Sequence, residues 1–120
     1  NYSTYLLAAA RDRGLLELES AVHKLTDVPA RLYGLKDRGR IEEGWWADLV
    51  VFDAQKVAPD EIEVREDLPG GGWRLYSEAI GVHHVFINGE QAVEDGAFTE
   101  ARPGTLLRSG RDTEKITANG

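Results

Sequence analysis

The sequence contains no cysteine and no methionine among its 120 residues. The absence of cysteine excludes disulfide bonds and any metal site built from thiolate ligands. Because methionine is absent, Asn1 is not an unprocessed translation start, and we expect either a trimmed N-terminus or a piece of a longer protein. No basic segment precedes the first apolar run, Leu6 to Ala10, so we expect no signal peptide within these residues.

Long apolar runs and an excess of positive charge are also missing. No run approaches the roughly 18 apolar residues of a membrane-spanning helix, so we expect no membrane partner. Fourteen basic residues stand against 21 acidic ones, and no basic cluster is present to displace counterions from phosphates. We therefore expect no nucleic-acid partner. With 42% hydrophobic residues, the chain suits a folded, soluble and cytoplasmic protein rather than a disordered segment.

Three helices are predicted in the first third of the chain. Residues 4–13 are rich in leucine and alanine, with Ser3 as a candidate N-cap and Gly14 as the C-terminal stop. A third, short helix can be capped by Thr26 or Asp27. The second helix, which lies between these two in the sequence, is predicted from the helical spacing of four apolar residues: Leu18, Ala21, Val22 and Leu25.

The rest of the chain has the pattern of β-structure. Leu49 to Phe52 is short, branched and apolar, which predicts a strand buried on both faces. Val82 to Ile87 is predicted as another strand. Asn88–Gly89 is typical of a type I′ hairpin turn, because asparagine and glycine tolerate the positive φ that both central positions need. The returning strand, Glu90 to Val93, and a turn at Asp95–Gly96 complete this pattern.

The polar side chains do not combine into a catalytic set. His83 and His84 are adjacent in a predicted strand, so they point to opposite faces and cannot easily share a metal. His23 stands alone on a predicted helix. Ser77 lacks the strained Gly-x-Ser-x-Gly turn of a hydrolytic nucleophile. We therefore assign no catalytic residue and no metal ligand to this chain.

Three further motifs have ordinary structural explanations. Glu42–Glu43 fits a solvated turn, because neighbouring glutamates in a loop rarely leave water. Pro69–Gly72 lacks the Lys-Ser/Thr that follows a phosphate-binding loop. Trp45 and Trp46 fall on opposite sides of an extended segment, so we expect one to pack inward and the other to cover an edge or another domain.

A longer pattern connects these pieces. Residues 34–53 contain Gly-x-Ile-x-x-Gly followed by Ala-Asp-Leu-Val-Val-Phe-Asp, which resembles a signature of the amidohydrolase superfamily. Residues 85–89 resemble the closing hairpin of that family, and residues 101–108 resemble its C-terminal end. The match covers about residues 1–108. Residues 67–72, together with Ala-Arg-Pro-Gly at the C-terminal end, resemble the D-aminoacylase branch, the N-acyl-D-amino-acid deacylases.

The resemblance implies an α+β fragment with a defined organisation. Residues 1–38 would be the last helices of a (β/α)8 metal-dependent hydrolase barrel. Residues 39–108 would form a small, all-β, sandwich-like accessory domain, and residues 109–120 a flexible tail. Asp48 would then lie at the transition between the two parts, where we expect it to accept hydrogen bonds from turn amides.

The resemblance also implies an activity for the parent protein. Such enzymes hydrolyse a C–N amide bond with zinc or a similar divalent ion, here in an N-acyl-D-amino acid, and the metal ligands would lie outside this chain. Tyr2, Ser3 and Tyr5 are the substrate-binding candidates, because loops after barrel strands line the catalytic face. The fragment alone is expected to be inactive and to associate with the missing N-terminal part or with another copy. Two alternatives stay open: a stand-alone β-rich binding or interaction module, and an amidohydrolase acting on cyclic amides.

Overall fold

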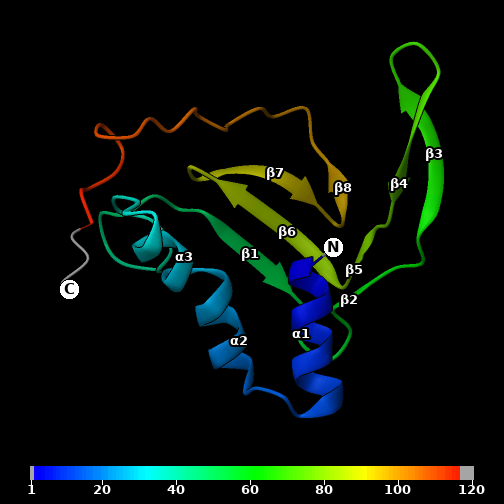
Figure 1. Ribbon diagram of the computed structural model, residues 1–120, viewed down its shortest axis with the longest axis horizontal. Helices are drawn as coiled ribbons and strands as arrows, with labels where there is room; N and C mark the ends of the chain where they lie inside the picture. The colour runs from blue at the N-terminus through cyan, green and yellow to red at the C-terminus, as the bar shows by residue number, and fades with distance from the viewer. Residues whose placement is uncertain (1, 117–120) are drawn as a thin grey trace.

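The computed structural model describes residues 2–116 of the chain. Residue 1, the first of the predicted helical segment, and residues 117–120, the end of the predicted tail, lie outside the described residues. No helix within residues 2–116 is both long and apolar enough to cross a lipid bilayer. Helices come first and strands follow (Figure 1): α1 (Tyr2–Arg13), α2 (Leu18–Leu25), α3 (Asp27–Leu32), β1 (Leu49–Phe52), β2 (Ala58–Pro59), β3 (Glu63–Leu68), β4 (Gly72–Tyr76), β5 (Ala79–Ile80), β6 (Val82–Ile87), β7 (Glu90–Glu94) and β8 (Ala97–Phe98).

The three predicted helices are confirmed, but Ser3 is not the N-cap of α1, and Thr26 is the N-cap residue of α3 without a capping hydrogen bond from its side chain. Ser3 lies inside α1, which already begins at Tyr2. Thr26 precedes α3, yet its hydroxyl donates a hydrogen bond of 2.9 Å to the carbonyl of Val22 and none to an amide of α3. Asp27 is the first residue of α3, and its carboxylate is held by basic side chains. Both residues use polar partners outside the first turn of α3, and these compete with local capping.

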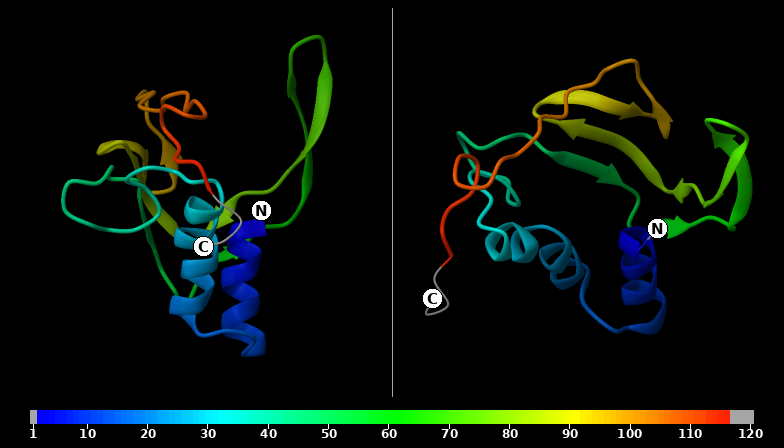
Figure 2. Two further views of the ribbon diagram at one scale, coloured as in Figure 1. Left: turned by 60° about the vertical axis from the view of Figure 1, so that its left-hand side comes forward. Right: turned by 45° about the horizontal axis from the view of Figure 1, so that its top comes forward.

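Antiparallel strands form three separate sheets. The largest has the order β1-β6-β7-β8, while β2-β5 and β3-β4 are two-stranded. Asn88 and Gly89 join β6 to β7 with φ of 52° and 83°, as the predicted type I′ turn requires. The β3–β4 hairpin stands apart from the large sheet (Figures 1 and 2). Within residues 2–116 the strands thus form one sheet and two ribbons, and these residues alone do not make the expected sandwich of two stacked sheets.

β1 is an edge strand rather than the doubly buried strand that its sequence predicts. It pairs with β6, with Leu49 opposite Phe86 and Val50 opposite Val85. Its other edge has no partner strand among the described residues. Val50 and Val51 remain 55% and 47% exposed. The prediction of burial is therefore wrong for this chain alone, because nothing in residues 2–116 covers the second side of the strand.

The sequence does not predict the β3–β4 hairpin. Most residues of β3 are charged, and charged residues have low β-propensity. The two strands are joined through the predicted loop around Pro69. Val64 lies opposite Leu75, and Arg74 of β4 pairs with Asp67 of β3 at 2.6 Å. The cross-strand pairs of this hairpin, rather than the composition of either strand, therefore account for it.

The core lies between the helices and one end of the large sheet. Leu7 of α1 and Ala21 of α2 belong to one buried cluster with Val57, which is 1% exposed. Arg11 of α1 donates hydrogen bonds to the carbonyl oxygens of Ala54 at 3.2 Å and Val57 at 3.0 Å. Apolar contact and these hydrogen bonds together fix α1 against the segment that follows β1.

Residues 99–116, here named the C-terminal arm, run back from β8 toward the helices (Figure 1). The Lys36 amide donates to the carbonyl of Asp112 at 3.1 Å, and the Glu114 amide donates to the carbonyl of Gly34 at 2.8 Å. A Cβ added to Gly34 would lie 2.6 Å from the Glu114 carbonyl oxygen, so this contact needs glycine. Asp112 and Glu114, which belong to the predicted tail, are therefore hydrogen-bonded to the loop after α3.

Candidate functional site

The three predicted substrate-binding residues lie in the first turns of α1. Tyr2, Ser3 and Tyr5 are all exposed. The guanidinium of Arg13 lies 6.0 Å from the centre of the Tyr5 ring. Phenol and hydroxyl groups donate and accept hydrogen bonds. This end of α1 therefore presents exposed polar groups at the surface.

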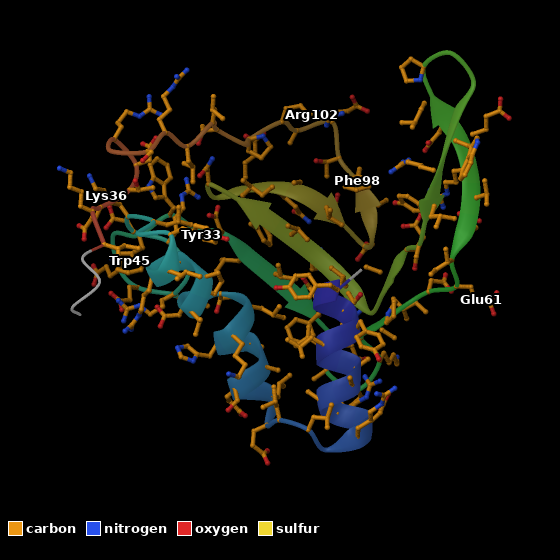
Figure 3. All side chains as sticks on the ribbon, viewed as in Figure 1. Tyr33, Lys36, Trp45, Glu61, Phe98 and Arg102 are labelled. Carbon is orange, nitrogen blue, oxygen red and sulfur yellow. The ribbon has the colours of Figure 1, made fainter. Side chains whose placement is uncertain are left out.

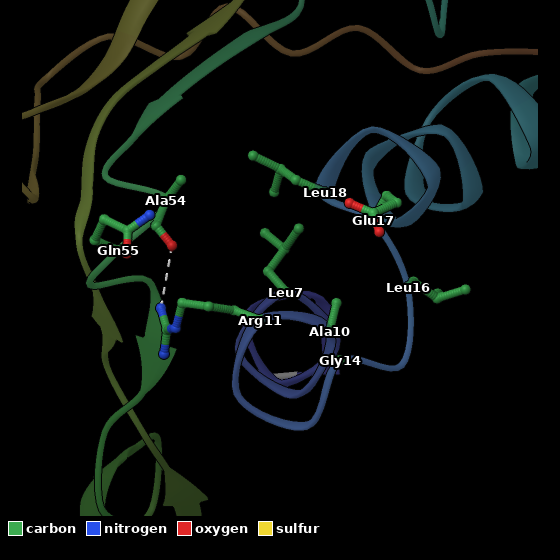
Figure 4. A pocket seen from close by; sticks show the side chains of 9 residues that line it. All are labelled: Leu7, Ala10, Arg11, Gly14, Leu16, Glu17, Leu18, Ala54 and Gln55. Atoms are coloured by element: carbon green, nitrogen blue, oxygen red, sulfur yellow. Dashed lines mark hydrogen bonds between the residues drawn. The ribbon is translucent and has the colours of Figure 1, made fainter.

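A surface pocket of about 240 Å³ lies at the opposite end of α1 (Figure 4). Its main basic group, Arg11, already donates to two carbonyl oxygens and pairs with Asp12 at 2.6 Å. The lining contains no histidine and no hydroxyl nucleophile, so it lacks the groups of a hydrolytic centre. The residues that line it are Leu7, Ala10, Arg11, Gly14, Leu16, Glu17, Leu18, Ala54 and Gln55. The pocket and the tyrosines therefore do not form one site.

The histidines do not meet at one point. The rings of His83 and His84 are 6.4 Å apart, and Nδ1 of His84 lies 3.2 Å from the side-chain nitrogen of Gln91. Nε2 of His23 lies 3.0 Å from the carboxylate of Asp27. Among residues 2–116, no group of three or more histidine, cysteine, aspartate or glutamate side chains is arranged to hold a metal ion.

Asp27 is the buried carboxylate of the helical region, with 5% exposure. Arg31 donates to it at 3.0 Å, and Arg40 lies at 3.3 Å. Burial disfavours the charged form, but hydrogen bonds from Arg31 and His23 and the charges of Arg31 and Arg40 prevail and lower the pKa of Asp27. Perturbed carboxylates often mark functional sites. The partners of Asp27 come from α2, α3 and the following loop, so its role is to join these segments.

Arg38, Asp48 and Asn88 form a second polar cluster, here named the Arg38 clamp. The guanidinium of Arg38, whose side chain is 11% exposed, pairs with Asp48 and donates to Oδ1 of Asn88 at 2.6 Å. The Asn88 amide donates to Asp48 at 2.9 Å. This confirms the expectation that Asp48 accepts from a turn amide. Nδ2 of Asn88 donates to the carbonyl of Pro103 at 2.6 Å, so the clamp joins three distant segments.

The two tryptophans differ in environment, as expected from their adjacent positions. Trp45 is half-buried with the guanidinium of Arg40 4.8 Å from its ring centre, and Trp46 is more exposed with Arg38 at 5.1 Å. Cation–π contacts of this kind contribute modestly at exposed positions. Trp45 lies on the same side of the molecule as α3 and Lys36 (Figure 3). Sequence analysis missed the role of Arg38, because nothing local marks an arginine whose partners lie far along the chain.

Known sequences and structures are similar to this chain. The model of the amidohydrolase family matches residues 3–93. The chain is 44% identical over 98 residues to an N-acyl-D-glutamate deacylase of Alcaligenes xylosoxydans xylosoxydans, covering 82% of this chain and 18% of that protein. It is 39% identical over 98 residues to a D-aminoacylase of the same organism, again covering 82% and 18%. A dihydroorotase of Archaeoglobus fulgidus is 32% identical over 98 residues, covering 80% and 23%.

A crystal structure of D-aminoacylase, described as defining a novel subset of amidohydrolases, superposes with a TM-score of 0.65 at 35% identity. The match covers 85% of this chain and 20% of that one. The chain thus spans about a fifth of the length of these relatives. Because the family match extends from α1 to β7 and the superposition covers most of the fold, the chain belongs to the amidohydrolase family.

Proposed function

We propose that this chain is the C-terminal part of a metal-dependent amidohydrolase that removes the acyl group from N-acyl-D-amino acids. The observation that carries the proposal is the 44% identity to an N-acyl-D-glutamate deacylase. Two further deacylases, a D-aminoacylase and an N-acyl-D-aspartate deacylase, are 39% and 37% identical. These three enzymes have in common that they act on an acylated D-amino acid. They differ in the side chain of the amino acid that they accept.

In this proposal α1, α2 and α3 are the last helices of a (β/α)8 barrel, and the large sheet belongs to an accessory sandwich. The unpaired edge of β1 and the exposed Val50 and Val51 support it, because free strand edges are normally paired or covered. Residues 1–120 expressed alone should therefore self-associate or bind a separately supplied N-terminal part. Sedimentation can test this, and a monomer with a sharp cooperative melt would favour a stand-alone module.

The metal of the parent enzyme is proposed to be zinc or a similar divalent ion with ligands outside this chain. A solved D-aminoacylase is described as having a binuclear metal center. The side chains of residues 2–116 do not fit such a centre, since His23 is engaged by Asp27 and the adjacent His83 and His84 lie on another element, β6. No catalytic step is therefore assigned to residues 2–116.

Tyr2, Ser3 and Tyr5 are proposed to contact the substrate from the first turns of α1. Their exposure in this chain supports the assignment, because nothing in residues 2–116 occupies their polar groups fully. Tyr2→Phe in the full-length enzyme should raise KM or lower kcat for N-acyl-D-amino acids. The matched control is Tyr33→Phe, which removes an exposed phenol at the end of α3. Equal kinetics for the two variants would contradict the assignment.

The activity is tested with the full-length protein and a panel of N-acyl-D-amino acids, their L-enantiomers and dihydroorotate. We expect release of free D-amino acid, loss of activity on chelation, and recovery with zinc. Cyclic-amide hydrolysis is the second candidate, because a dihydroorotase is 32% identical. Turnover of dihydroorotate with no deacylation would replace the first proposal with the second.

A further inference from the structure

The Asn88–Gly89 turn contains a reactive pair of residues. The backbone nitrogen of a glycine can attack the side-chain carbonyl carbon of the preceding asparagine, because glycine has no Cβ to obstruct the approach. A nitrogen–carbon bond forms, ammonia leaves, and a five-membered imide results. Water then opens the imide at either carbonyl and yields aspartate or isoaspartate. The reaction needs no reagent other than water.

In the fold, the groups that would react are held apart from one another by hydrogen bonds. The attacking N–H of Gly89 is donated to the carbonyl of Ala47 at 3.0 Å. The carboxamide of Asn88 is held at both ends, by Arg38 at Oδ1 and by the Pro103 carbonyl at Nδ2, each at 2.6 Å. Ring closure requires the Gly89 amide to leave its acceptor and the carboxamide to rotate. The rotation of the carboxamide requires the bond from Arg38 to Asn88, and with it the Arg38 clamp, to open.

The product would not fit where the asparagine sits. An aspartate at position 88 places a carboxylate oxygen where Nδ2 now donates to the Pro103 carbonyl, so two acceptors would face each other. It would also place a second negative charge beside Asp48, with Arg38 as their common partner. Isoaspartate would in addition lengthen the backbone of a two-residue turn, which has no room for extra atoms.

The C-terminal arm depends on this contact. Within residues 2–116, the bond from Asn88 to Pro103 is the hydrogen bond that ties the stretch 100–110 to the body of the molecule. Bonds of Thr99 anchor the arm before this stretch, and bonds to residues 34–36 anchor it afterwards. Loss of the middle tether would leave about ten residues of the arm held only at their ends.

We propose that Asn88–Gly89 is a latent deamidation site that the Arg38 clamp protects in the native fold, and that its conversion to aspartate or isoaspartate releases the middle of the C-terminal arm. The site records opening of the clamp, because the reaction is slow while the clamp is closed and irreversible once it has occurred.

The test incubates the full-length protein at mildly alkaline pH and follows the tryptic peptide from Leu75 to Arg108, in which Asn88 is the sole asparagine. Deamidation should be at least about tenfold slower in native buffer than in urea, since it must await local opening. Arg38→Gln should raise the native rate toward the urea rate. The matched control is Arg40→Gln, which changes the same residue type on the same loop without a bond to Asn88.

Equal rates in native buffer and urea, or equal native rates for Arg38→Gln and Arg40→Gln, would overturn the protection. Gly89→Ala keeps the test decisive if Arg38→Gln does not fold. In urea it should slow the reaction of Asn88, because a Cβ now obstructs ring closure, and an unchanged rate would overturn the assignment of the chemistry.

A second measurement tests the effect on the arm. Asn88→Asp should increase hydrogen exchange across residues 100–110, whereas Gln91→Glu, the same chemical change in the neighbouring strand, should not. Exchange that is the same in both variants would overturn the proposed release.

Discussion

The four-stranded sheet and the β3–β4 hairpin use the same antiparallel pairing but are held in different ways. The sheet is joined to the helices through buried Val57 and is fastened across its turn by the Arg38 clamp. The hairpin is held by its own surface groups. The guanidinium groups of Arg65 and Arg74 lie 3.7 and 4.7 Å from the Tyr76 ring, and Arg74 pairs with Asp67 at 2.6 Å.

The difference shows that strand pairing alone does not decide how strongly a region is stabilised. Val64 and Leu75 lie opposite each other on the hairpin, yet both are exposed. Exposed ion pairs contribute little, because water and salt screen them. The sheet should therefore be sensitive to small changes at its buried contacts, while the hairpin should tolerate equivalent changes. Three substitution pairs test this contrast, and a fourth tests the hairpin alone.

The largest effect is expected at Gly81, which joins β5 to β6. It has φ of 74°, and an added Cβ would lie 2.8 Å from the backbone nitrogen of Val57. Gly81→Ala should lower the free energy of unfolding by about 3 kcal/mol through strain and overpacking. Gly70→Ala at the hairpin tip, with φ of 76° and nothing within 4 Å, should cost only about 1 kcal/mol. Urea denaturation measures both, and equal losses would refute the contrast.

Valine truncation gives the next largest difference. Val57→Ala leaves a cavity in the core and should lower the free energy of unfolding by about 2 kcal/mol. Val64→Ala removes the same atoms from the exposed hairpin, where the change should stay within about 0.5 kcal/mol. Thermal melting of the two variants is the measurement. A large loss for Val64→Ala would show that another surface covers the hairpin.

Acid should cost the helical support of the sheet more stability than it costs the hairpin, because Asp27 is buried whereas the side chain of Asp67 is partly exposed. The pKa of Asp27 and that of Asp67 are both lowered, the latter by its hydrogen bonds from Arg74. A lowered pKa stabilises the fold above the unfolded value, near about 3.9, and the contribution is lost as pH falls through the folded pKa. Asp27→Asn should flatten the acid limb of a stability–pH curve more than Asp67→Asn. The reverse order would contradict the assignment of Asp27 as the buried link.

Salt should reveal the smallest effect. Arg74→Gln removes the ion pair with Asp67, and both side chains are partly exposed. The small loss of stability that this substitution causes at low salt should disappear at about 1 M salt, because the Debye length is then roughly 3 Å and the ion pair is screened. Arg74→Lys, which keeps the charge but not the two-point contact, is the control. A loss that persists at high salt would indicate that packing on Tyr76, rather than charge, holds the hairpin.

Sequence patterns identified the parts of this fold that depend on local conformation. Gly14 and Asn88–Gly89 occur where the backbone needs positive φ, so their positions could be predicted. The exposure of β1 could not, because four apolar residues look the same whether their cover belongs to this chain or to another surface. The hairpin was missed since its charged residues pair across the strands, and the bond from Arg38 to Asn88 spans 50 positions.

The pairing of β1 with a distant strand has a consequence during synthesis. β1 pairs with β6, so Phe52 leaves the ribosome about 30 residues before its partner strand begins at Val82. At about 5–20 residues per second this interval lasts on the order of seconds. The neighbouring hairpins close in microseconds, so they do not delay the sheet. For that interval Leu49 to Phe52 is an unpaired apolar strand, the kind of segment that chaperones bind and that aggregates when it is left alone.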